Sequence, residues 1–579
     1  MEILLFFLAM AVFLAVIFVR EAVDARKKEK KFIKSLYDNY GGIPDKEYSL
    51  ERYARMGSYY EKHIQEGQID DITWNDLDMD EIFKRMNYTF SASGEEYLYY
   101  KLRNTNQNPE ELEHFEDVVN FFENNPDERV KIQYLMRKLG HTGKFSLYDY
   151  IDNLDFLGER SNRRHVLLNL LFLPMIALIP FNAGLGIVGI AGLMIYNILS
   201  YFKEKSEIDP YIISFAYILR LINICDELLK INIPVCRKEW EYIKEHQCNL
   251  RGMRRGAFLV MGAERSKTTG NPLDIILDYL RMVFHLDLIQ FNKMLNHLRL
   301  HTEDVDGLIT CVGYVETAIA TGAFRKSLPV YCVPELSEQE EEHTLQKTSE
   351  GTVLRALDGT DGMVLTEAYH PLIADAVRNS ISTRKGVLLT GSNASGKSTF
   401  LKTVAINAIL AQTIHTCTAD SYKAPFFRIY SSMALRDDIS GGESYYIVEI
   451  KALKRILDAA SRSRTPVLCF VDEVLRGTNT VERIAASTQI LKSLTGMNIL
   501  CFAATHDIEL TELLKNDYNN YHFEEEVLDG DVVFNYKLLK GEATTRNAIK
   551  LLEVLGYQSE IIERASAQAE AFIRTGTWT

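Results

Sequence analysis

The chain has 579 residues, of which 47% are hydrophobic and 25% are charged. This length and balance are typical of a folded protein with several domains and exclude a largely disordered chain. The net charge of −14 and the pI near 5.5 exclude a surface that is basic over the whole molecule, although a local basic patch for nucleic acid stays open. The eight cysteines lack C-x-x-C spacing, which favours reduced core thiols over disulfides or zinc ligands.

An apolar run from Ile3 to Val19 opens the chain, and it is just long enough to span a bilayer. A signal peptide is the competing interpretation, with a cleavage site near Ala25. No basic residue precedes the run, and by the positive-inside rule the basic residues after it keep the downstream chain in the cytoplasm. These are Arg20, Arg26, Lys27, Lys28, Lys30 and Lys31. The sequence therefore predicts an uncleaved anchor over residues 1–20, in the cell membrane.

Helical patterns follow the anchor. Residues 21–75 are polar and rich in aromatic residues, which is typical of a connector. Residues 203–345, chiefly from Ile208 to about Ala323, place apolar residues at i, i+3 and i+4, and they predict the second part of a helical module whose first part is residues 76–165. The second part holds the strongest local basic cluster, which suits a phosphate backbone or lipid headgroups, with a solvated helix face as the alternative. The cluster consists of Arg251, Arg254, Arg255, Arg265 and Lys267.

A second membrane signal separates the two parts of the helical module. Residues 166–202 are apolar and are interrupted at Pro180 to Gly184. Basic residues at both ends place both flanks in the cytoplasm. The pattern predicts a hairpin of two spanning helices and so a multi-pass protein. Because the first leg is short and contains Pro174, a re-entrant hairpin and a buried core hairpin are the alternatives.

The pattern G-x-x-x-x-G-K-[ST] occurs at residues 391–398. The apolar residues 386–389 before it predict a buried strand, and a helix is expected after it. This context directs backbone N–H groups and the positive end of a helix at a phosphate. Lys397 would reach the β- and γ-phosphates, and the Ser398 hydroxyl would ligate Mg²⁺. The predicted nucleotide-binding residues are Gly391, Ser392, Asn393, Ala394, Ser395, Gly396, Lys397, Ser398 and Thr399.

Two further apolar strands end in residues suited to phosphate chemistry. The strand at 466–471 leads into Asp472, which can hold Mg²⁺, and Glu473, which can position the attacking water. The strand at 498–504 leads to His506, whose imidazole could sense the γ-phosphate. Between these strands and the phosphate loop, the small residues and hydroxyl that end at Ser444 precede an expected helix, and they could donate to a phosphate.

Taken in this order, these residues resemble the ATPase domain of the MutS family, a branch of the ABC-type ATPases. The resemblance covers roughly the last 220 residues, which is the length of one domain. It rests on the phosphate loop, Ser444 to Ile450, Asp472 to Thr480, Ala504 to Asp507, and His370, Pro371 and Asn379. It implies an α/β P-loop domain over 350–579, in which His370 and Asn379 contact adenine and ribose. In this family two ATPase domains pair, so Ser444 would complete the site of the partner.

The resemblance also implies a function. The chain would be a Mg²⁺-dependent ATP hydrolase that works as a homodimer. The stretch from Asp80 to Leu102 also resembles the opening of the family's helical core, which implies that the helical module serves as core and lever. Its catalytic residues would be Glu473, His506 and Lys397, and its metal ligands Ser398 and Asp472. Only the anchor and the connector precede the core, so we expect no mismatch-recognition domain, and we expect no appended nuclease domain.

The partner on which such an ATPase acts stays open at this stage. By family resemblance the implied partner is double-stranded DNA, through binding related to mismatch repair. The alternative is an ATP-driven switch or scaffold for membrane proteins with no DNA role. The expected architecture is therefore multidomain, with an α-helical module, a C-terminal α/β ATPase domain, a transmembrane helix and a transmembrane hairpin.

Overall fold

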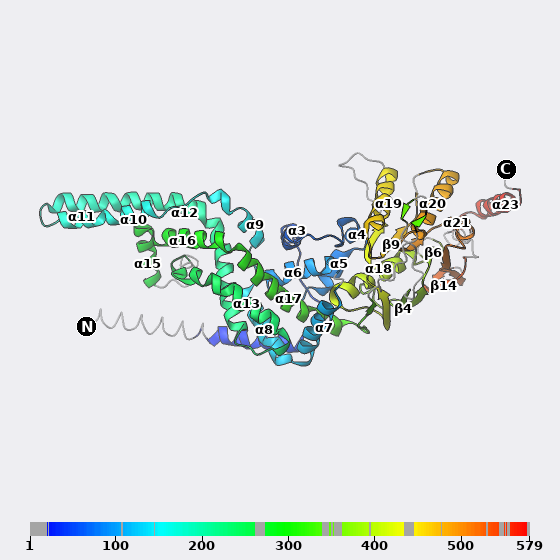
Figure 1. Cartoon of the computed structure of the whole chain (residues 1–579), viewed down its shortest axis with the longest axis horizontal. Helices are drawn as coiled ribbons and strands as arrows, with labels where there is room; N and C mark the ends of the chain where they lie inside the picture. Colours follow the sequence, from blue (N-terminus) through cyan, green and yellow to red (C-terminus); the bar gives the residue numbers. More distant parts are fainter. Residues whose placement is uncertain are drawn as a thin grey trace. The chain divides into compact units, whose positions relative to one another are not determined.

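The computed structural model describes residues 20, 23–105, 108–143, 145–260, 272–337, 347–348, 351–352, 362–392, 395–433, 445–475, 478–528, 531–542, 549, 552 and 556–575 (Figure 1). Apart from Arg20, the predicted anchor at 1–20 lies outside these residues. The chain forms two compact units. Unit 1 comprises Met1–Ile64, Asn87–Tyr100 and Asp117–Phe324, and unit 2 comprises Gln65–Met86, Lys101–Glu116 and Arg325–Thr579.

The described elements of unit 1 are helices, as the periodicity of the sequence led us to expect. They are residues 23–38, α2 (Leu50–Met56), α3 (Ser58–Lys62), α6 (Ala92–Arg103), α7 (Pro109–Asn124), α8 (Pro126–Leu139), α9 (Leu147–Asp152), η1 (Leu154–Leu157), α10 (Arg163–Leu170), α11 (Phe172–Leu178), α12 (Ala183–Leu228), η2 (Pro234–Cys236), α13 (Arg237–Leu250), η3 (Arg251–Arg254), α15 (Pro272–Phe284), α16 (Leu286–Leu300) and α17 (Thr302–Ser327). The division between the units falls within α6, α7 and α17.

The core of unit 1 is organised around α17. Its apolar stretch is 89% buried, so it is a core helix although its length and composition would also allow a membrane crossing. A Cβ at Gly313 would lie 2.4 Å from the Cβ of Tyr97, which means that α6 and α17 cross in direct contact at this glycine. The Glu316 carboxylate accepts hydrogen bonds from the backbone N–H groups of Phe90 and Ser91 and so caps the start of α6. Burial raises the pKa of Glu316 to about 7.

The apolar segment at 166–202 forms a helical hairpin. α10 and α11 make the first leg, and α12 begins the second at Ala183 after a turn in which the Asn182 side chain accepts from the Leu185 N–H. A Cβ at Gly189 would lie 2.5 Å from the Met175 sulfur, so the legs touch there. The most apolar window of α12 is only 17% buried, which contradicts the buried core hairpin considered as an alternative.

Unit 2 combines sheets with helices. Its six-stranded sheet has the order β14-β11-β6-β10-β9-β8, and a four-stranded sheet has the order β1-β7-β4-β5. The strands are β1 (Glu335–Ser337), β2 (Lys347–Thr348), β3 (Gly351–Thr352), β4 (Met363–Ala368), β5 (Asn379–Thr383), β6 (Gly386–Thr390), β7 (Ser421–Pro425), β8 (Arg428–Ser432), β9 (Val467–Asp472), β10 (Ile499–Ala504), β11 (Tyr518–His522), β12 (Glu525–Leu528), β13 (Asp531–Phe534) and β14 (Leu539–Lys540). The helices are α4 (Asp71–Asp76), α5 (Met79–Met86), α18 (Lys397–Ile414), α19 (Tyr445–Arg462), α20 (Thr480–Thr495), α21 (Glu509–Leu513) and α23 (Ser559–Thr575).

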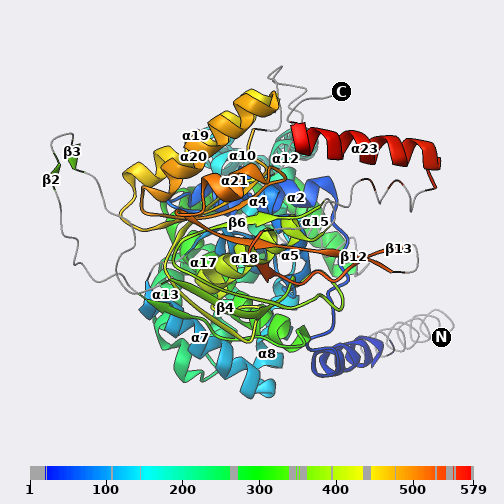
Figure 2. The same ribbon diagram turned by 90° about the vertical axis from the view of Figure 1, so that its right-hand side faces the viewer.

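The layers of unit 2 place one helix between two sheets. α18 packs against β9 and β10 on one side and against β4 on the other, while α19 and α20 cover the opposite face of the six-stranded sheet (Figure 2). β6, β9 and β10 are parallel neighbours, so their carboxyl ends meet at one edge. This is the P-loop architecture that the sequence predicts for the C-terminal part.

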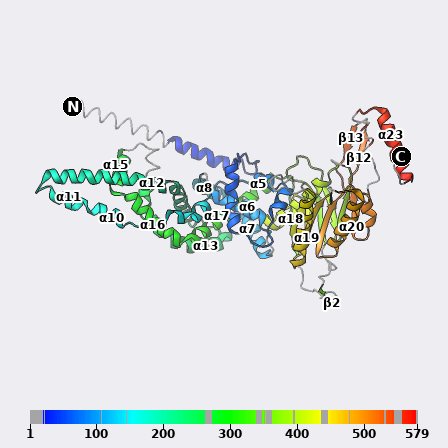
Figure 3. The ribbon, with the colours of Figure 1, turned by 90° about the horizontal axis from the view of Figure 1, so that it is seen from above.

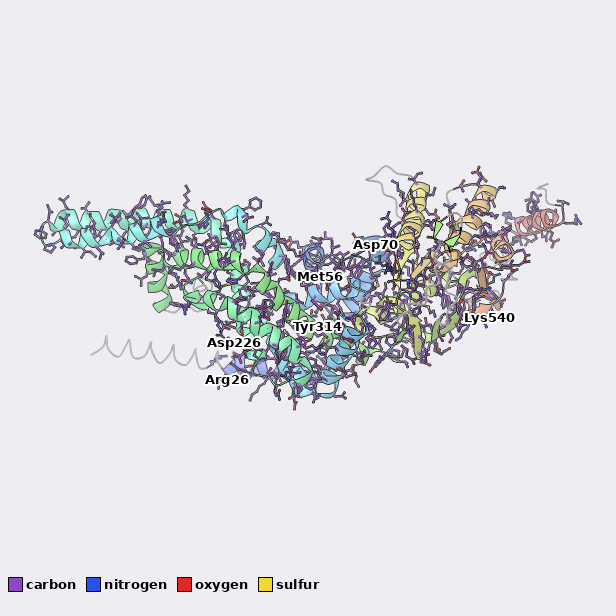
Figure 4. All side chains as sticks on the ribbon, viewed as in Figure 1. Arg26, Met56, Asp70, Asp226, Tyr314 and Lys540 are labelled. Carbon is purple, nitrogen blue, oxygen red and sulfur yellow. The ribbon has the colours of Figure 1, made fainter. Side chains whose placement is uncertain are left out.

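The boundaries of unit 2 differ from those expected. Residues 71–75, placed with the connector from the sequence, form α4 on the edge strand β8 together with Asp76, which was placed in the helical module. The Asp76 carboxylate accepts from the Ser431 hydroxyl at 2.7 Å and from the Met433 N–H at 2.9 Å. Asp70, labelled in Figure 4, pairs with Arg455 of α19 at 2.7 Å. Since these carboxylates satisfy polar groups along β8 and α19, the edge of the sheet is completed by a segment remote in sequence.

A buried ion pair joins α7, α17 and the end of α18 within unit 2. The guanidinium of Arg325, which is 1% exposed, donates to both carboxylate oxygens of Glu116 at 2.8 and 2.6 Å. It also donates to Thr416 and to the backbone oxygen of His415, the residue that ends α18 in the left-handed region (φ 52°). The pair therefore fixes the end of the helix whose beginning carries the phosphate loop.

Candidate nucleotide-binding site

The phosphate loop connects β6 to α18 through two glycines in unusual conformations. Gly391 has φ 140° and Gly396 has φ 108°, a region that other residues rarely adopt. A Cβ at Gly391 would also lie 2.7 Å from the Phe523 backbone oxygen. The loop therefore needs glycine at both positions, and it leaves the N-terminus of α18 open to an anion.

The residues around this loop fit a nucleotide. They border a cavity of about 600 Å³. The Ser395 hydroxyl is buried and has no hydrogen-bond partner among the described residues, so it is free to contact a ligand. Ser398 and Thr399 line the cavity from the first turn of α18. The predicted ligands Asn393 and Ala394 lie outside the described residues.

Three predicted catalytic side chains meet at the edge of the cavity. Lys397 donates to the backbone oxygens of Gly391 and Ser392 at 2.9 and 2.8 Å. His506 Nε2 lies 2.8 Å from Glu473 Oε1 and 3.4 Å from Lys397 Nζ. One ring nitrogen cannot donate to a carboxylate and accept from an ammonium at once, so the hydrogen bond is the one to Glu473. The imidazole thus lies between the cation and the acid.

Strand register explains why these side chains meet. Asp472 is the last residue of β9 and pairs with Ala504 of β10. Glu473 follows with φ 59°, and its N–H donates to the Ala504 oxygen at 2.9 Å. With its backbone held in this way, Glu473 borders the cavity. The structure therefore brings both acidic residues beside the loop that carries Lys397.

The two residues expected to contact adenine and ribose lie on the same cavity but differ in their surroundings. Burial and the nearby Lys402 lower the pKa of His370 to about 4, so its imidazole is neutral at pH 7. Asn379 uses its amide to hold the segment after β13, since it donates to the Tyr536 oxygen at 2.9 Å and accepts from the Leu538 N–H at 2.8 Å. In the described structure Asn379 thus positions Tyr536.

Sequence reasoning missed the aromatic lining of the cavity. Tyr536 is 44% exposed, has φ 54°, stacks on Phe534 and lies against Gly396. Phe400 and Phe523 also line the cavity, with their rings 5.9 Å apart. An exposed ring held at the mouth of a phosphate site offers a surface on which a base can stack. No local pattern marks Tyr536 in the sequence, because it lies far from the phosphate loop along the chain.

Comparisons with known proteins agree with this geometry. The family model of MutS domain V matches residues 387–573. The DNA mismatch repair protein MutS of Thermus thermophilus is 35% identical over 187 residues, which are 32% of this chain and 23% of that protein. DNA mismatch repair protein MutS 2 of Haloarcula marismortui is 31% identical over 219 residues, 37% of this chain and 21% of that protein. DNA mismatch repair protein MutS of Pseudothermotoga lettingae is 32% identical over 214 residues, 35% of this chain and 26% of that protein.

Residues 387–573 of this chain thus match domain V of the MutS family. The family assignment rests on domain V, because the matches cover about a quarter of the length of these relatives and about a third of this chain. Ser444, the residue expected to act in trans, lies outside the described residues, and the rest of the expected signature element, Tyr445 to Ile450, forms the start of α19. Within the basic cluster, Arg265 and Lys267 also lie outside them, and Arg254 is paired with Asp226, which Figure 4 labels.

A buried acid of unit 2 supports the loop that carries Glu473. The Glu449 side chain on α19 is 8% exposed, and its carboxylate accepts a hydrogen bond from the Leu475 N–H. Leu475 has φ 60° and Glu473 has φ 59°, so two residues of this short loop are held in a region that costs about 1–3 kcal/mol for non-glycine residues. The Glu449 carboxylate offsets part of this cost and thereby positions Glu473.

Replacing Glu449 by alanine is therefore expected to lower kcat for ATP by about 10–100-fold, because a displacement of about 1 Å at a catalytic group has an effect of this size. Nucleotide affinity should change little, since Glu449 does not line the cavity. Glu449→Gln keeps an acceptor oxygen and should retain most of the activity. Asp458→Ala, on the exposed face of the same helix, is the control. Equal kcat values for Glu449→Ala and Asp458→Ala would contradict this positioning role.

Proposed function

We propose that this chain is a membrane-anchored ATPase of the MutS family that hydrolyses ATP at a composite site between two subunits and acts on DNA. The observation that carries the proposal is the meeting of Lys397, Glu473 and His506 at the carboxyl ends of β6, β9 and β10. The fit of the cavity to a nucleotide supports it.

The chemistry follows from residues of the chain. The Lys397 ammonium would leave the loop carbonyls to neutralise the phosphate that is transferred. Glu473 would orient the attacking water and accept its proton. His506 hydrogen-bonds to Glu473 and lies next to Lys397, so an incoming γ-phosphate offers it a competing acceptor. In this way His506 would report the presence of the phosphate to Glu473.

A metal ion and a second subunit complete the proposed site. The Ser398 hydroxyl and the Asp472 carboxylate are hard oxygen ligands that would hold Mg²⁺, which neutralises phosphate charge when bound. His370 and Asn379 would border the adenine and ribose, together with the Tyr536 ring. Ser444 of one subunit would contact the nucleotide of its partner in a homodimer.

The membrane part of the proposal rests on unit 1. Large apolar side chains are exposed along the hairpin, and water is a poor solvent for such a surface. The helix over 23–38 follows the predicted anchor, and its Phe32 packs edge-on against Phe90 of the same unit at 5.7 Å. We therefore place the chain in the cell membrane with its ATPase domain in the cytoplasm, and we assign the helical module the role of core and lever.

The DNA role is tested by the ATPase rate of the full-length protein in lipid discs, with and without duplex DNA, over a salt series. We expect DNA to stimulate turnover, and we expect stimulation to fall steeply with salt because phosphate contacts release counterions. Glu473→Gln, which should bind DNA without turnover, is the control. DNA is favoured because the relatives named above are DNA mismatch repair proteins.

A basal rate that no DNA changes, together with no DNA binding by Glu473→Gln, would contradict the DNA role. The second candidate function, an ATP-driven switch or scaffold for membrane proteins, would then be preferred. The exposed hairpin and the net charge of −14 favour that candidate. The experiment therefore decides whether the ATPase acts on DNA or on membrane proteins, and either result leaves the assignment of ATP hydrolysis in place.

A further inference from the structure

The hairpin of α10, α11 and α12 has an asymmetric distribution of polar groups. Residues 166–202 contain no charged residue. At the base, Arg164 of the first leg donates to the Tyr196 hydroxyl at 3.1 Å, to the Ser200 hydroxyl at 3.2 Å and to Glu204 at 3.3 Å. These bonds gather charged and polar groups of both legs over about 12 Å of α12, from Tyr196 to Glu204, which suits the zone between water and lipid.

Beyond this level the two legs are apolar. Residues 170–181 and 183–195 contain only apolar side chains and glycine, and Asn182 between them is used as the helix cap. Phe181 at the tip is 88% exposed. The other large exposed side chains beyond the base are Leu170, Leu171, Leu173, Ile176, Leu185, Ile187, Val188, Met194 and Ile195. Figure 4 shows side chains projecting from both visible edges of the hairpin. Such exposure is typical of a segment surrounded by lipid.

The length of this apolar part is too small to cross a bilayer. α12 rises about 20 Å between Tyr196 and Ala183 at 1.5 Å per residue, whereas the hydrocarbon core is about 30 Å thick. Crossing fully would draw Arg164 and the two hydroxyls that it binds, those of Tyr196 and Ser200, into hydrocarbon, which is costly for charged and polar groups. The tip also offers no charged residue to hold it in the far headgroups.

A second feature marks the same boundary. The side-chain amides of Asn169 and Asn197 donate to the backbone oxygens of Phe284 and Val283 at 2.8 Å, so both legs hold the end of α15 at the base. α15 packs against α10 and α12 and is drawn below the hairpin, pointing away from it, in Figure 1, and Figure 3 gives the view from above. Tyr279 of α15 is 63% exposed. An amphipathic aromatic side chain at this level suits the headgroup region.

We infer that the hairpin is re-entrant: it dips from the cytoplasmic face into the hydrocarbon and returns, with its tip past the midplane, while α15 lies in the headgroup region as a collar. This inference rests on the membrane part of the proposed function and replaces two spanning helices with one inserted wedge. Both flanks stay in the cytoplasm. The surface that the hairpin presents is therefore fitted to the acyl chains of a bilayer.

Depth-dependent quenching tests the inference in the full-length protein reconstituted into phosphatidylcholine vesicles. The variants Phe181→Trp and Ile195→Trp place a tryptophan at exposed positions of the tip and of the base. Lipids brominated near the chain ends and lipids brominated near the headgroups are compared, with the wild-type signal subtracted. For the re-entrant hairpin, deep bromines quench most of the added fluorescence of Phe181→Trp, and shallow bromines quench that of Ile195→Trp.

A spanning hairpin reverses this order, since its tip then lies in the far headgroups and Ile195 lies in the interior. Any order in which Phe181→Trp is not the deeper of the two overturns the inference while leaving membrane insertion in place. Absence of quenching for both variants would instead remove the membrane part of the proposed function. Phe181→Leu, which should keep membrane retention and ATP turnover, controls for loss of the ring.

Discussion

Replacing Glu473 by glutamine is expected to lower ATP turnover by about 10²–10⁴-fold, the usual contribution of a general base, while nucleotide binding is kept. The amide cannot accept the proton of the attacking water, but its shape fits the same loop. The structure gives Glu473 a place on the cavity and a hydrogen bond to His506 at 2.8 Å. Steady-state turnover and the affinity for a fluorescent ATP analogue measure the two effects.

Two further variants serve as controls for Glu473→Gln. Lys397→Ala should lose nucleotide affinity as well as turnover, because the ammonium contacts phosphate directly. Glu482→Gln changes an exposed acid at the start of α20 and should leave both unchanged. Turnover in Glu473→Gln within about threefold of the wild type would remove Glu473 from the role of base, since it is far below the usual effect.

Replacing Arg325 by methionine is expected to destabilise unit 2 by about 3–5 kcal/mol, the usual effect of removing one partner of a buried ion pair. The change leaves the Glu116 carboxylate without its bidentate donor and the His415 oxygen without one of its bonds. Hydrogen exchange of the α18 amides in the full chain measures the loss. Lys326→Met, at the next and exposed position of α17, is the control.

The same pair makes stability depend on pH in a defined direction. Burial opposes ionisation of Glu116, but Arg325 and His415 outweigh it and lower its pKa to about 2 from 4.5. A lowered pKa gives stability that is complete above 4.5 and is lost as the pH falls towards 2. The difference in thermal midpoint between wild type and Glu116→Gln should therefore shrink over this range. A difference that stays constant down to pH 2.5 would contradict the ionised pair.

The strand, loop and helix around the phosphate site could be predicted from the sequence, because local rules govern them. Four apolar residues before Gly391 and the fixed spacing to Lys397 determine a strand that enters a helix. The helices of unit 1 follow from periodicity in the same way, and so does the turn at Asn182. Asp472 and His506 were predictable candidates because both follow apolar strands.

Other features depend on contacts between residues far apart in the chain. Asp76 accepts hydrogen bonds from the Ser431 hydroxyl and the Met433 N–H, and no pattern near Asp76 in the sequence predicts that it contacts a strand. Tyr536 lines the cavity, and its backbone is held by Asn379, a residue far away in the chain. The local sequence does not distinguish Glu449 from other acidic residues on helices. Its role depends on its burial in the fold and on the hydrogen bond from the Leu475 N–H. Tertiary packing, rather than propensity, decides such positions.

The position of α4 on β8 limits which fragments of the protein can keep the six-stranded sheet intact. The stretch after residue 350 holds the nucleotide cavity, yet the sheet edge that leads towards the signature element is finished by Asp70 and Asp76. A fragment expressed from residue 350 onward would expose that edge and leave Arg455 without its carboxylate partner. Unit 2 is built from three separate stretches of the chain, so a transfer of this unit between relatives would keep it intact only if the intervening helical stretches were carried along.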